Sequence, residues 1–140
     1  MTMSMLNIFN VAGSATSAQS QRLNVVASNL ANADTVAGPD GKAYKARQVT
    51  FQTQLMGTAG GNIGAAGVAV SNISEDQTPG RRVHDQAHPS ADADGYVTYS
   101  NVNAIEEMVN MISASRSYQN NVEVMNTAKS LLLKTLQMGS

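Results

Sequence analysis

Two histidines on either side of an aspartate are the residues of this chain best suited to metal or acid–base chemistry. They lie in the segment His84-Asp85-Gln86-Ala87-His88 and are the only histidines in the chain. Zinc sites use histidine and carboxylate ligands, so a metal-dependent hydrolase is one hypothesis for this segment. However, Pro89 follows directly, and Asp85 stands where a helical zinc peptidase motif has its general-base glutamate. The sequence therefore favours a surface turn with local hydrogen bonds.

Three further patterns are too incomplete for the chemistry they suggest. Asp92-Ala93-Asp94-Gly95 resembles the start of a calcium loop, but the later ligands and the final glutamate are missing, so we expect a glycine-containing turn. The glycine-rich stretch Gly57–Gly67 lacks the lysine of a phosphate-binding loop and is typical of a flexible loop. Cysteine is absent, which excludes thiol catalysis and thiolate metal sites. We therefore predict no catalytic residue, no metal site and no cofactor.

The composition points to surfaces that other chains cover. Charged residues make up 14% of the 140 residues and aromatic residues 4%, against about 25% charged residues in ordinary globular domains. The net charge of −1 gives no support for binding to nucleic acid. We also expect no membrane-spanning segment and no cleaved secretory signal, since a basic start and a long apolar core are missing from the first residues.

The stretch Asn101–Leu136 predicts a long helix. It contains neither glycine nor proline, and Asn101 or Asn103 would cap its start. The residues that face inward are expected to recur in alternating steps of four and three along the helix, and a second row of residues lies beside them. The first row is Ala104, Met108, Met111, Ser115, Tyr118, Val122, Met125, Lys129, Leu132 and Leu136, and the second is Ile105, Ile112, Gln119, Asn126 and Leu133.

A second long helix is predicted over Ser4–Ala33. The same steps recur in it, and Arg22 is the only charged side chain before Asp34, so we expect packing on more than one face. Its row is Met5, Phe9, Ala12, Thr16, Gln19, Leu23, Val26 and Leu30.

The part between the helices is different in character, since it holds nine of the eleven glycines and all three prolines. Short strands are expected at Tyr44–Leu55 (through Tyr44, Ala46, Gln48–Phe51 and Leu55), at Gly67–Ile73 and at Tyr96–Tyr99. The predicted fold is mainly α, with long N- and C-terminal helices that form an antiparallel coiled-coil pair around a small irregular or β-rich middle segment. The expected boundaries are 1–33, 34–100 and 101–140. A helical hairpin confined to one chain would give the same pattern.

Several motifs resemble those of bacterial flagellar proteins. Ser28-Asn29 followed by Leu30-Ala31-Asn32-Ala33-Asp34-Thr35 is similar to the N-terminal motif of flagellar rod and hook proteins, and Glu107–Val124 with Asn126, Thr127 and Lys129 is similar to their C-terminal motif. Gly38–Gly41 with Tyr44, and His88–Val97, resemble the family of the proximal-rod C protein of the flagellar basal body. Gln86 and Ser100 depart from the proline that this family often has.

The resemblance implies a structural subunit of the proximal rod, which is the hollow shaft that transmits motor torque and surrounds the export channel. The implied partners are further copies of the chain, other rod proteins, the adaptor proteins between membrane ring and rod, the distal rod protein and the flagellar type III export apparatus. The implied location is the periplasmic rod of the basal body, reached by export without a cleaved signal peptide.

The resemblance and the two apolar rows together give two sets of candidate site residues. Those expected to pack the helices together are Met5, Phe9, Leu23, Val26, Leu30, Met108, Ile112, Val122, Met125, Leu132 and Leu136. Those expected at contacts between subunits are Ser28, Asn29, Asn32, Arg116, Tyr118, Gln119 and Asn120. Besides the hydrolase hypothesis, a soluble helical binding module or a secretion chaperone is the alternative.

Overall fold

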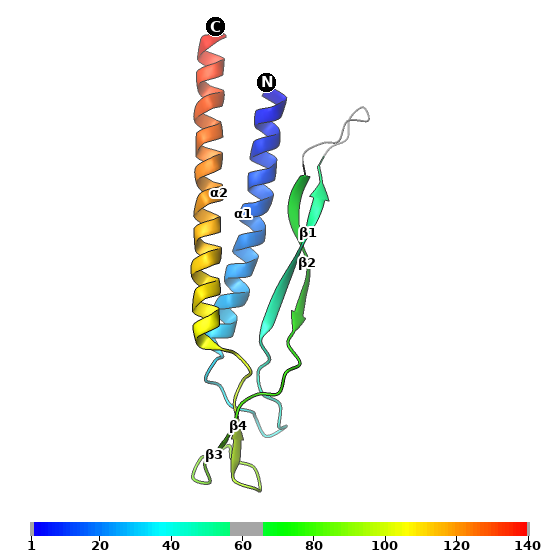
Figure 1. Cartoon of the computed structure of the whole chain (residues 1–140), viewed down its shortest axis with the longest axis vertical. Coiled ribbons are helices and arrows are strands. Elements are labelled where there is room, and N and C mark those ends of the chain that lie inside the picture. The colour runs from blue at the N-terminus through cyan, green and yellow to red at the C-terminus, as the bar shows by residue number, and fades with distance from the viewer. Residues whose placement is uncertain (1, 57–65, 140) are drawn as a thin grey trace. The chain divides into compact units, whose positions relative to one another are not determined.

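The computed structural model describes residues 2–56 and 66–139, with side chains from residue 5 onward. The elements in chain order are α1 (Thr2–Ala31), β1 (Arg47–Leu55), β2 (Ala66–Glu75), β3 (Arg82–His84), β4 (Tyr96–Thr98) and α2 (Ala104–Met138) (Figure 1). This confirms the predicted mainly α fold, with two long terminal helices and a small β middle. The part of the predicted glycine-rich loop at 57–65 lies outside the described residues.

The burial of side chains along α1 agrees with the predicted inward row. Ala12 and Val26 are buried, and the other members of the row are half-buried where their side chains are described. Small side chains make much of the contact, since Ala18 off the row is also buried. The near absence of charge along α1 therefore matches a helix that is covered over a broad face.

Helix α2 begins where its sequence supplies a cap. The side-chain Oδ1 of Asn103 accepts hydrogen bonds from the backbone N–H groups of Ile105, at 3.1 Å, and Glu106, at 3.2 Å. These are two of the N–H groups that the helix itself leaves free. Glu106 lies in the first turn, where the helix dipole favours negative charge.

The inward row of α2 differs from the predicted one. Ala104, Met111, Met125 and Leu132 lie inward as expected, but Ala114 and Ala128 are the buried residues of the helix, each one position before the predicted residue. The predicted second row is exposed. Sequence reasoning placed the larger apolar side chains inward, whereas the small alanines allow α2 to lie closer to its neighbours.

The β middle consists of two separate two-stranded sheets, β1–β2 and β3–β4. Strands β3 and β4 are antiparallel, and Val83 lies opposite the fully buried Val97. The three predicted strands are present as β1, β2 and β4, although β1 begins only at Arg47, three residues after the predicted start at Tyr44, and β2 continues two residues beyond Ile73. Strand β3 was not predicted, because its three residues include two that are charged or polar.

The chain forms two compact units. Unit 1 contains Met1–Leu23, Thr50–Asn72 and Ser113–Ser140, and unit 2 contains Asn24–Val49 and Ile73–Ile112. Each unit therefore takes a part of both long helices and a part of the β1–β2 sheet. Among the described residues, neither long helix has an apolar stretch sufficient to cross a bilayer.

Unit 1 joins β2 and α2 to α1 through small residues. The Ser14 hydroxyl donates to the Val11 carbonyl at 2.7 Å and accepts from the Val68 N–H at 3.1 Å. Gly67 is buried at this contact, and a Cβ there would lie 2.7 Å from Ser14 Oγ. The Thr16 hydroxyl lies 3.9 Å from the sulfur of Met125, which brings the two helices into contact in this unit.

Candidate assembly surfaces

A buried asparagine ties three segments of unit 2 together. Asn29 has no exposed surface. Its Nδ2 donates to the Arg47 carbonyl at 2.9 Å and to the Glu107 carboxylate at 3.0 Å. Its Oδ1 accepts from the Arg47 N–H at 2.9 Å and the Tyr44 hydroxyl at 2.8 Å. All four hydrogen-bonding positions of the amide are thus used, and they link α1 to the start of β1 and the first turn of α2.

The side chains around Asn29 extend this arrangement, which we call the Asn29 hub (Ser28, Asn29, Tyr44, Arg47 and Glu107). The hydroxyls of Ser28 and Tyr44 are 3.1 Å apart. Asn32 also bonds within the chain, since its Nδ2 donates to the Ser28 carbonyl at 2.9 Å. Sequence reasoning assigned Ser28, Asn29 and Asn32 to contacts between subunits, but these three side chains make hydrogen bonds inside their own subunit.

A second polar junction, in which Ser100 is buried and Asn101 half-buried, lies just before α2. The Asn101 side chain accepts from the Ala46 N–H at 2.6 Å and donates to the carbonyls of Asp76 and Thr78, both at 2.8 Å. The buried Ser100 donates its hydroxyl to the Ala33 carbonyl at 2.7 Å. Its N–H also donates to the Thr35 carbonyl at 3.3 Å, which a proline could not do. The sequence pattern indicates Asn101 only as a possible helix cap, and no signal in it points to this bridging role.

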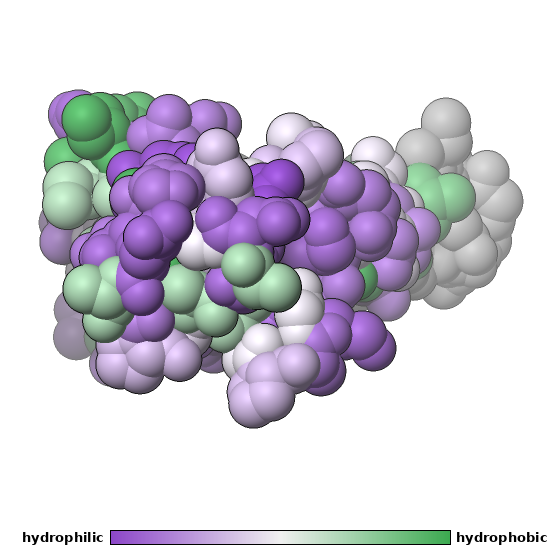
Figure 2. Space-filling model, turned by 90° about the horizontal axis from the view of Figure 1, so that it is seen from below, coloured by the Kyte–Doolittle hydropathy of each residue, from purple (hydrophilic) through white to green (hydrophobic). Residues whose placement is uncertain are grey.

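Helix α2 of unit 2 carries an exposed apolar ridge. The ridge consists of Ile105, Met108, Val109 and Ile112, which are 75%, 54%, 61% and 60% exposed. Four large apolar side chains within two helical turns make a surface that is suited to cover by another chain. The face of the molecule shown in Figure 2 is largely hydrophilic, with hydrophobic residues gathered in separate patches.

Unit 1 has an apolar groove between its parts of α1 and α2. The groove has a volume of about 460 Å³ and is lined by Ile8, Asn120, Glu123, Val124, Thr127, Ala128 and Leu131. A smaller hollow of about 280 Å³ adjoins it, since Ile8 and Val124 line both. We call the larger one the Ile8 groove. Its apolar walls and single charged residue fit the side of a helix rather than a small polar ligand.

The residues predicted to pack the helices together fall into two groups. The first group is buried or half-buried and consists of Met5, Phe9, Leu23, Val26, Leu30, Val122, Met125 and Leu132. The second group, Met108, Ile112 and Leu136, is 54%, 60% and 58% exposed. Those three face outward because α2 presents its alanines inward. Arg116, Gln119 and Asn120 are exposed, and Tyr118 is 36% exposed, as surface contacts between subunits would require.

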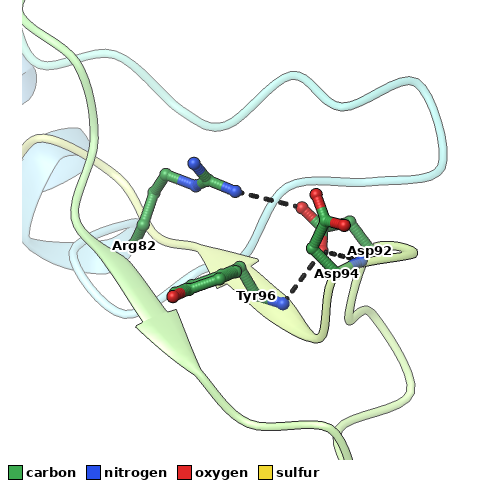
Figure 3. A network of polar contacts seen from close by, with 4 residues as sticks. All are labelled: Arg82, Asp92, Asp94 and Tyr96. Atoms are coloured by element: carbon green, nitrogen blue, oxygen red, sulfur yellow. Dashed lines mark hydrogen bonds and ion pairs between the residues drawn. The ribbon is translucent and has the colours of Figure 1, made fainter.

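The segment that resembled a calcium loop is a turn held by one carboxylate. Asp92 Oδ1 accepts from the N–H groups of Asp94 and Tyr96, both at 2.9 Å, and Asp92 Oδ2 pairs with Arg82 at 3.2 Å (Figure 3). The hydrogen bond from the Tyr96 N–H is the main cause that lowers the pKa of Asp92, and Arg82 adds to it. Gly95 closes the turn with a φ of 84°, which glycine adopts without strain.

Both histidines make local contacts near the β3–β4 sheet. The His84 ring meets the Tyr96 ring edge-on, with centroids 5.0 Å apart. His88 Nδ1 accepts from the Ser90 N–H at 3.0 Å, which confirms the predicted surface turn with local hydrogen bonds. Within residues 2–56 and 66–139, no three potential metal ligands of the His, Cys, Asp or Glu type lie together.

Two family models match the chain at the parts described above. The model of flagella basal body rod proteins matches residues 9–39, which contain most of α1 and Asn29. The model of the C-terminal part of flagellar basal body rod FlgEFG proteins matches residues 93–138, which contain β4 and α2.

Similar proteins cover almost the whole chain. The flagellar basal-body rod protein FlgC of Yersinia enterocolitica is 60% identical, over 98% of this chain and 99% of its own length. The proteins of that name from Escherichia coli O6:H1 and Salmonella typhimurium strain LT2 are each 56% identical, with the same coverage. They are named as rod proteins of the flagellar basal body, which supports the prediction of a structural protein rather than an enzyme. The chain belongs to the FlgC family of flagellar basal-body rod proteins.

Proposed function

We propose that this chain is a structural subunit of the proximal rod of the bacterial flagellar basal body. It assembles with copies of itself and with other rod proteins into the hollow shaft that transmits motor torque and surrounds the export channel. The observation that carries the proposal is the exposed apolar ridge on α2, in a chain whose relatives are rod proteins over almost their full length. A monomer with this ridge uncovered has a surface that assembly would remove from water.

The two long helices would form the inner wall of the rod as an antiparallel coiled-coil pair. Residues 1–33 and 101–140 would make this core, and 34–100 the segment that reaches neighbouring subunits. Contacts of α1 with α2 within each unit support the pairing, namely Thr16 with Met125 in unit 1 and Asn29 with Glu107 in unit 2. The packing residues would be Met5, Phe9, Leu23, Val26, Leu30, Val122, Met125 and Leu132.

Contacts between subunits would use the outward side of α2. Met108, Ile112 and Leu136 would be covered by neighbours, and Arg116, Tyr118, Gln119 and Asn120 would add polar contacts around them. Each apolar surface removed from water contributes about 25 cal/mol per Å², before the cost of association. Torque would thus pass through many weak contacts, without a chemical step.

The proposed partners follow from this position in the flagellum. They are other rod proteins, the adaptor proteins at the base of the rod, the distal rod protein and the flagellar type III export apparatus. The proposed location within the basal body is the periplasmic part of the rod.

Tyr118→Asp tests the proposal. A carboxylate in a packed layer between helices loses its hydration, so rod assembly should fail while the chain is still made and folded. The measurement is basal-body purification and electron microscopy from cells that produce only the variant, with swimming as a second readout. Tyr118→Phe is the matched control and should retain assembly. Normal basal bodies in the Tyr118→Asp strain would refute the role of this surface.

A further inference from the structure

Helix α2 is exposed on two different sides within unit 1. The buried Ala128 marks its inward side. At about 100° per residue along a helix, the other α2 residues of the Ile8 groove all lie to one side of Ala128. Three further residues lie to the other side and are exposed. We call them the unit 1 flank, and they are Lys129, Leu133 and Leu136.

Both surfaces carry apolar side chains that their own subunit leaves uncovered. Leu133 and Leu136 of the flank are 50% and 58% exposed. Ile8, Val124 and Leu131 of the groove are 44%, 48% and 49% exposed. Because Leu133 and Leu136 are three residues apart, they project next to each other from α2. A narrow apolar projection on one side of the unit and an apolar groove on another are the two parts of a helix-in-groove contact.

The charges of the two surfaces are complementary as well. Glu123 is the only charged residue that lines the groove, and Lys129 is the charged residue of the flank. Among the residues that the structure describes, the one ion pair joins Arg82 to Asp92, so neither Glu123 nor Lys129 has an ionic partner there. Each of them gains a partner when the flank of one copy enters the groove of another.

A parallel pair of α2 helices brings the apolar and the charged contacts together. With the second helix shifted by six residues, or about 9 Å, Lys129 of one copy lies level with Glu123 of the other. The two leucines of the flank then lie level with Thr127 and, within one residue, with Leu131, which both line the groove. Both kinds of contact therefore agree on one arrangement.

We infer that, in the assembled rod, neighbouring copies of this chain are joined side by side by this contact, with the unit 1 flank of one copy in the Ile8 groove of the next. The occupant of the groove is thus a second copy of this chain. The inference rests on the proposed function and identifies the surfaces by which copies meet. Since flank and groove are different surfaces of one unit, each copy can use both at once, and the contact repeats in one direction as a growing shaft requires.

Disulfide cross-linking in assembled basal bodies tests the contact. Because the chain has no cysteine, the double variant Thr127→Cys/Leu133→Cys carries one thiol in the groove and one on the flank. The shift of six residues places position 133 of one copy beside position 127 of the next. After oxidation, basal bodies from cells that produce only this variant should give a ladder of dimers, trimers and larger multimers on a gel without reductant. Within one chain the two positions point to different sides of α2, so they cannot bridge each other.

Two control variants establish the direction of the contact. Thr127→Cys/Lys134→Cys places the second thiol one residue from Leu133 but on the groove side of α2, so it should give no ladder. Thr127→Cys alone should remain monomeric on the gel, and dimers from it would show a two-fold contact between grooves and overturn the inference.

The outcomes for the contact and for the proposed function can be told apart. Basal bodies that assemble normally but give no ladder from Thr127→Cys/Leu133→Cys would overturn the inference, while the proposed function would stand. Wild-type basal bodies that lack the chain would refute the proposed function, and the inference with it.

Charge reversal tests the same contact without cysteines. Lys129→Glu and Glu123→Lys should each reduce the yield of purified basal bodies by about two- to fivefold, because like charges then face each other. Lys129→Glu/Glu123→Lys should restore the yield, since the pair forms again with its signs exchanged. Ser130→Glu, at an exposed position outside both surfaces, is the matched control and should leave the yield unchanged. A double variant with no better yield than the single variants would contradict the pairing.

Discussion

The side chain of Asn29 shows how much of unit 2 depends on one residue. Its amide is fully buried and makes four hydrogen bonds to two segments that are distant in sequence, residues 44–47 and the first turn of α2. A buried donor or acceptor that loses its partner costs about 1–3 kcal/mol. The amide therefore specifies how α1, β1 and α2 come together in a way that an apolar side chain of the same size would not.

Asn29→Asp is expected to lower the free energy of unfolding by about 2–4 kcal/mol. The carboxylate cannot donate to the Arg47 carbonyl, and it would lie beside the carboxylate of Glu107. Urea unfolding followed by circular dichroism measures the effect. Asn24→Asp, at an exposed position of the same helix, is the control and should stay within about 0.5 kcal/mol of the wild type. Equal stability of the two variants would contradict the role given to Asn29.

For the polar residues of the candidate site, the sequence indicates that contacts are made but does not identify their partners. Asparagine and serine in an almost uncharged helix indicate that polar contacts are made, but they do not tell whether the partner is in the same subunit. Asn29 finds its partners at residues 44, 47 and 107 of its own chain. Whether Asn29 finds its partners in its own subunit depends on the path of the middle segment. The sequence of that segment has no periodic pattern from which its path could be predicted.

At the scale of the elements, both long helices could be predicted from the spacing of their apolar residues and from the absence of glycine and proline in α2. The face of α2 was less predictable. Met108, Ile112 and Leu136 were expected inward because large apolar residues are usually buried, but Ala114 and Ala128 take the inward positions. In a chain that assembles, a large apolar residue does not identify the side that is buried within the subunit.

Two glycines of unit 1 should respond to alanine in opposite directions. A Cβ at Gly67 would lie 2.6 Å from Met56 Cε and 2.7 Å from Ser14 Oγ, whereas a Cβ at Gly13 would meet nothing within 4 Å. We expect Gly67→Ala to destabilise the chain by about 1–3 kcal/mol through overpacking. Gly13→Ala should stabilise it by about 0.5–1 kcal/mol, since alanine favours a helix interior. Thermal unfolding of both variants tests this, and a stabilised Gly67→Ala would show that β2 does not pack on α1 as described.

At the scale of the whole molecule, the apolar surface is distributed unequally between inside and outside. Six of the eight buried apolar residues in the described part of the chain are alanines, and the other two are valines. Large apolar residues such as Ile105, Leu131 and Met138 are exposed. Each buried alanine removes little apolar area from water. Burial within one subunit therefore supplies only a small share of the free energy that the apolar surface of the chain could contribute.

Amide hydrogen exchange on dilute monomer should show this distribution along the chain. We expect little protection in the first turns of α1 and the last turns of α2, where Leu6, Ile8, Leu136 and Met138 are 53%, 44%, 58% and 88% exposed. Protection should be higher around Asn29 and Asn101, whose side chains are fixed by several hydrogen bonds. Uniformly strong protection to both helix ends would contradict this expectation.

The alanine-rich interior has a consequence for mass action. A subunit whose own core contributes little is stabilised mainly by whatever binds its folded form, so its apparent stability increases with the concentration of neighbouring copies. A chain of this kind unfolds at low cost when it is alone and resists unfolding once many copies surround it. With alanine at positions such as 114 and 128, the stability of the fold therefore depends on the bound neighbouring copies more than on the contacts within one subunit.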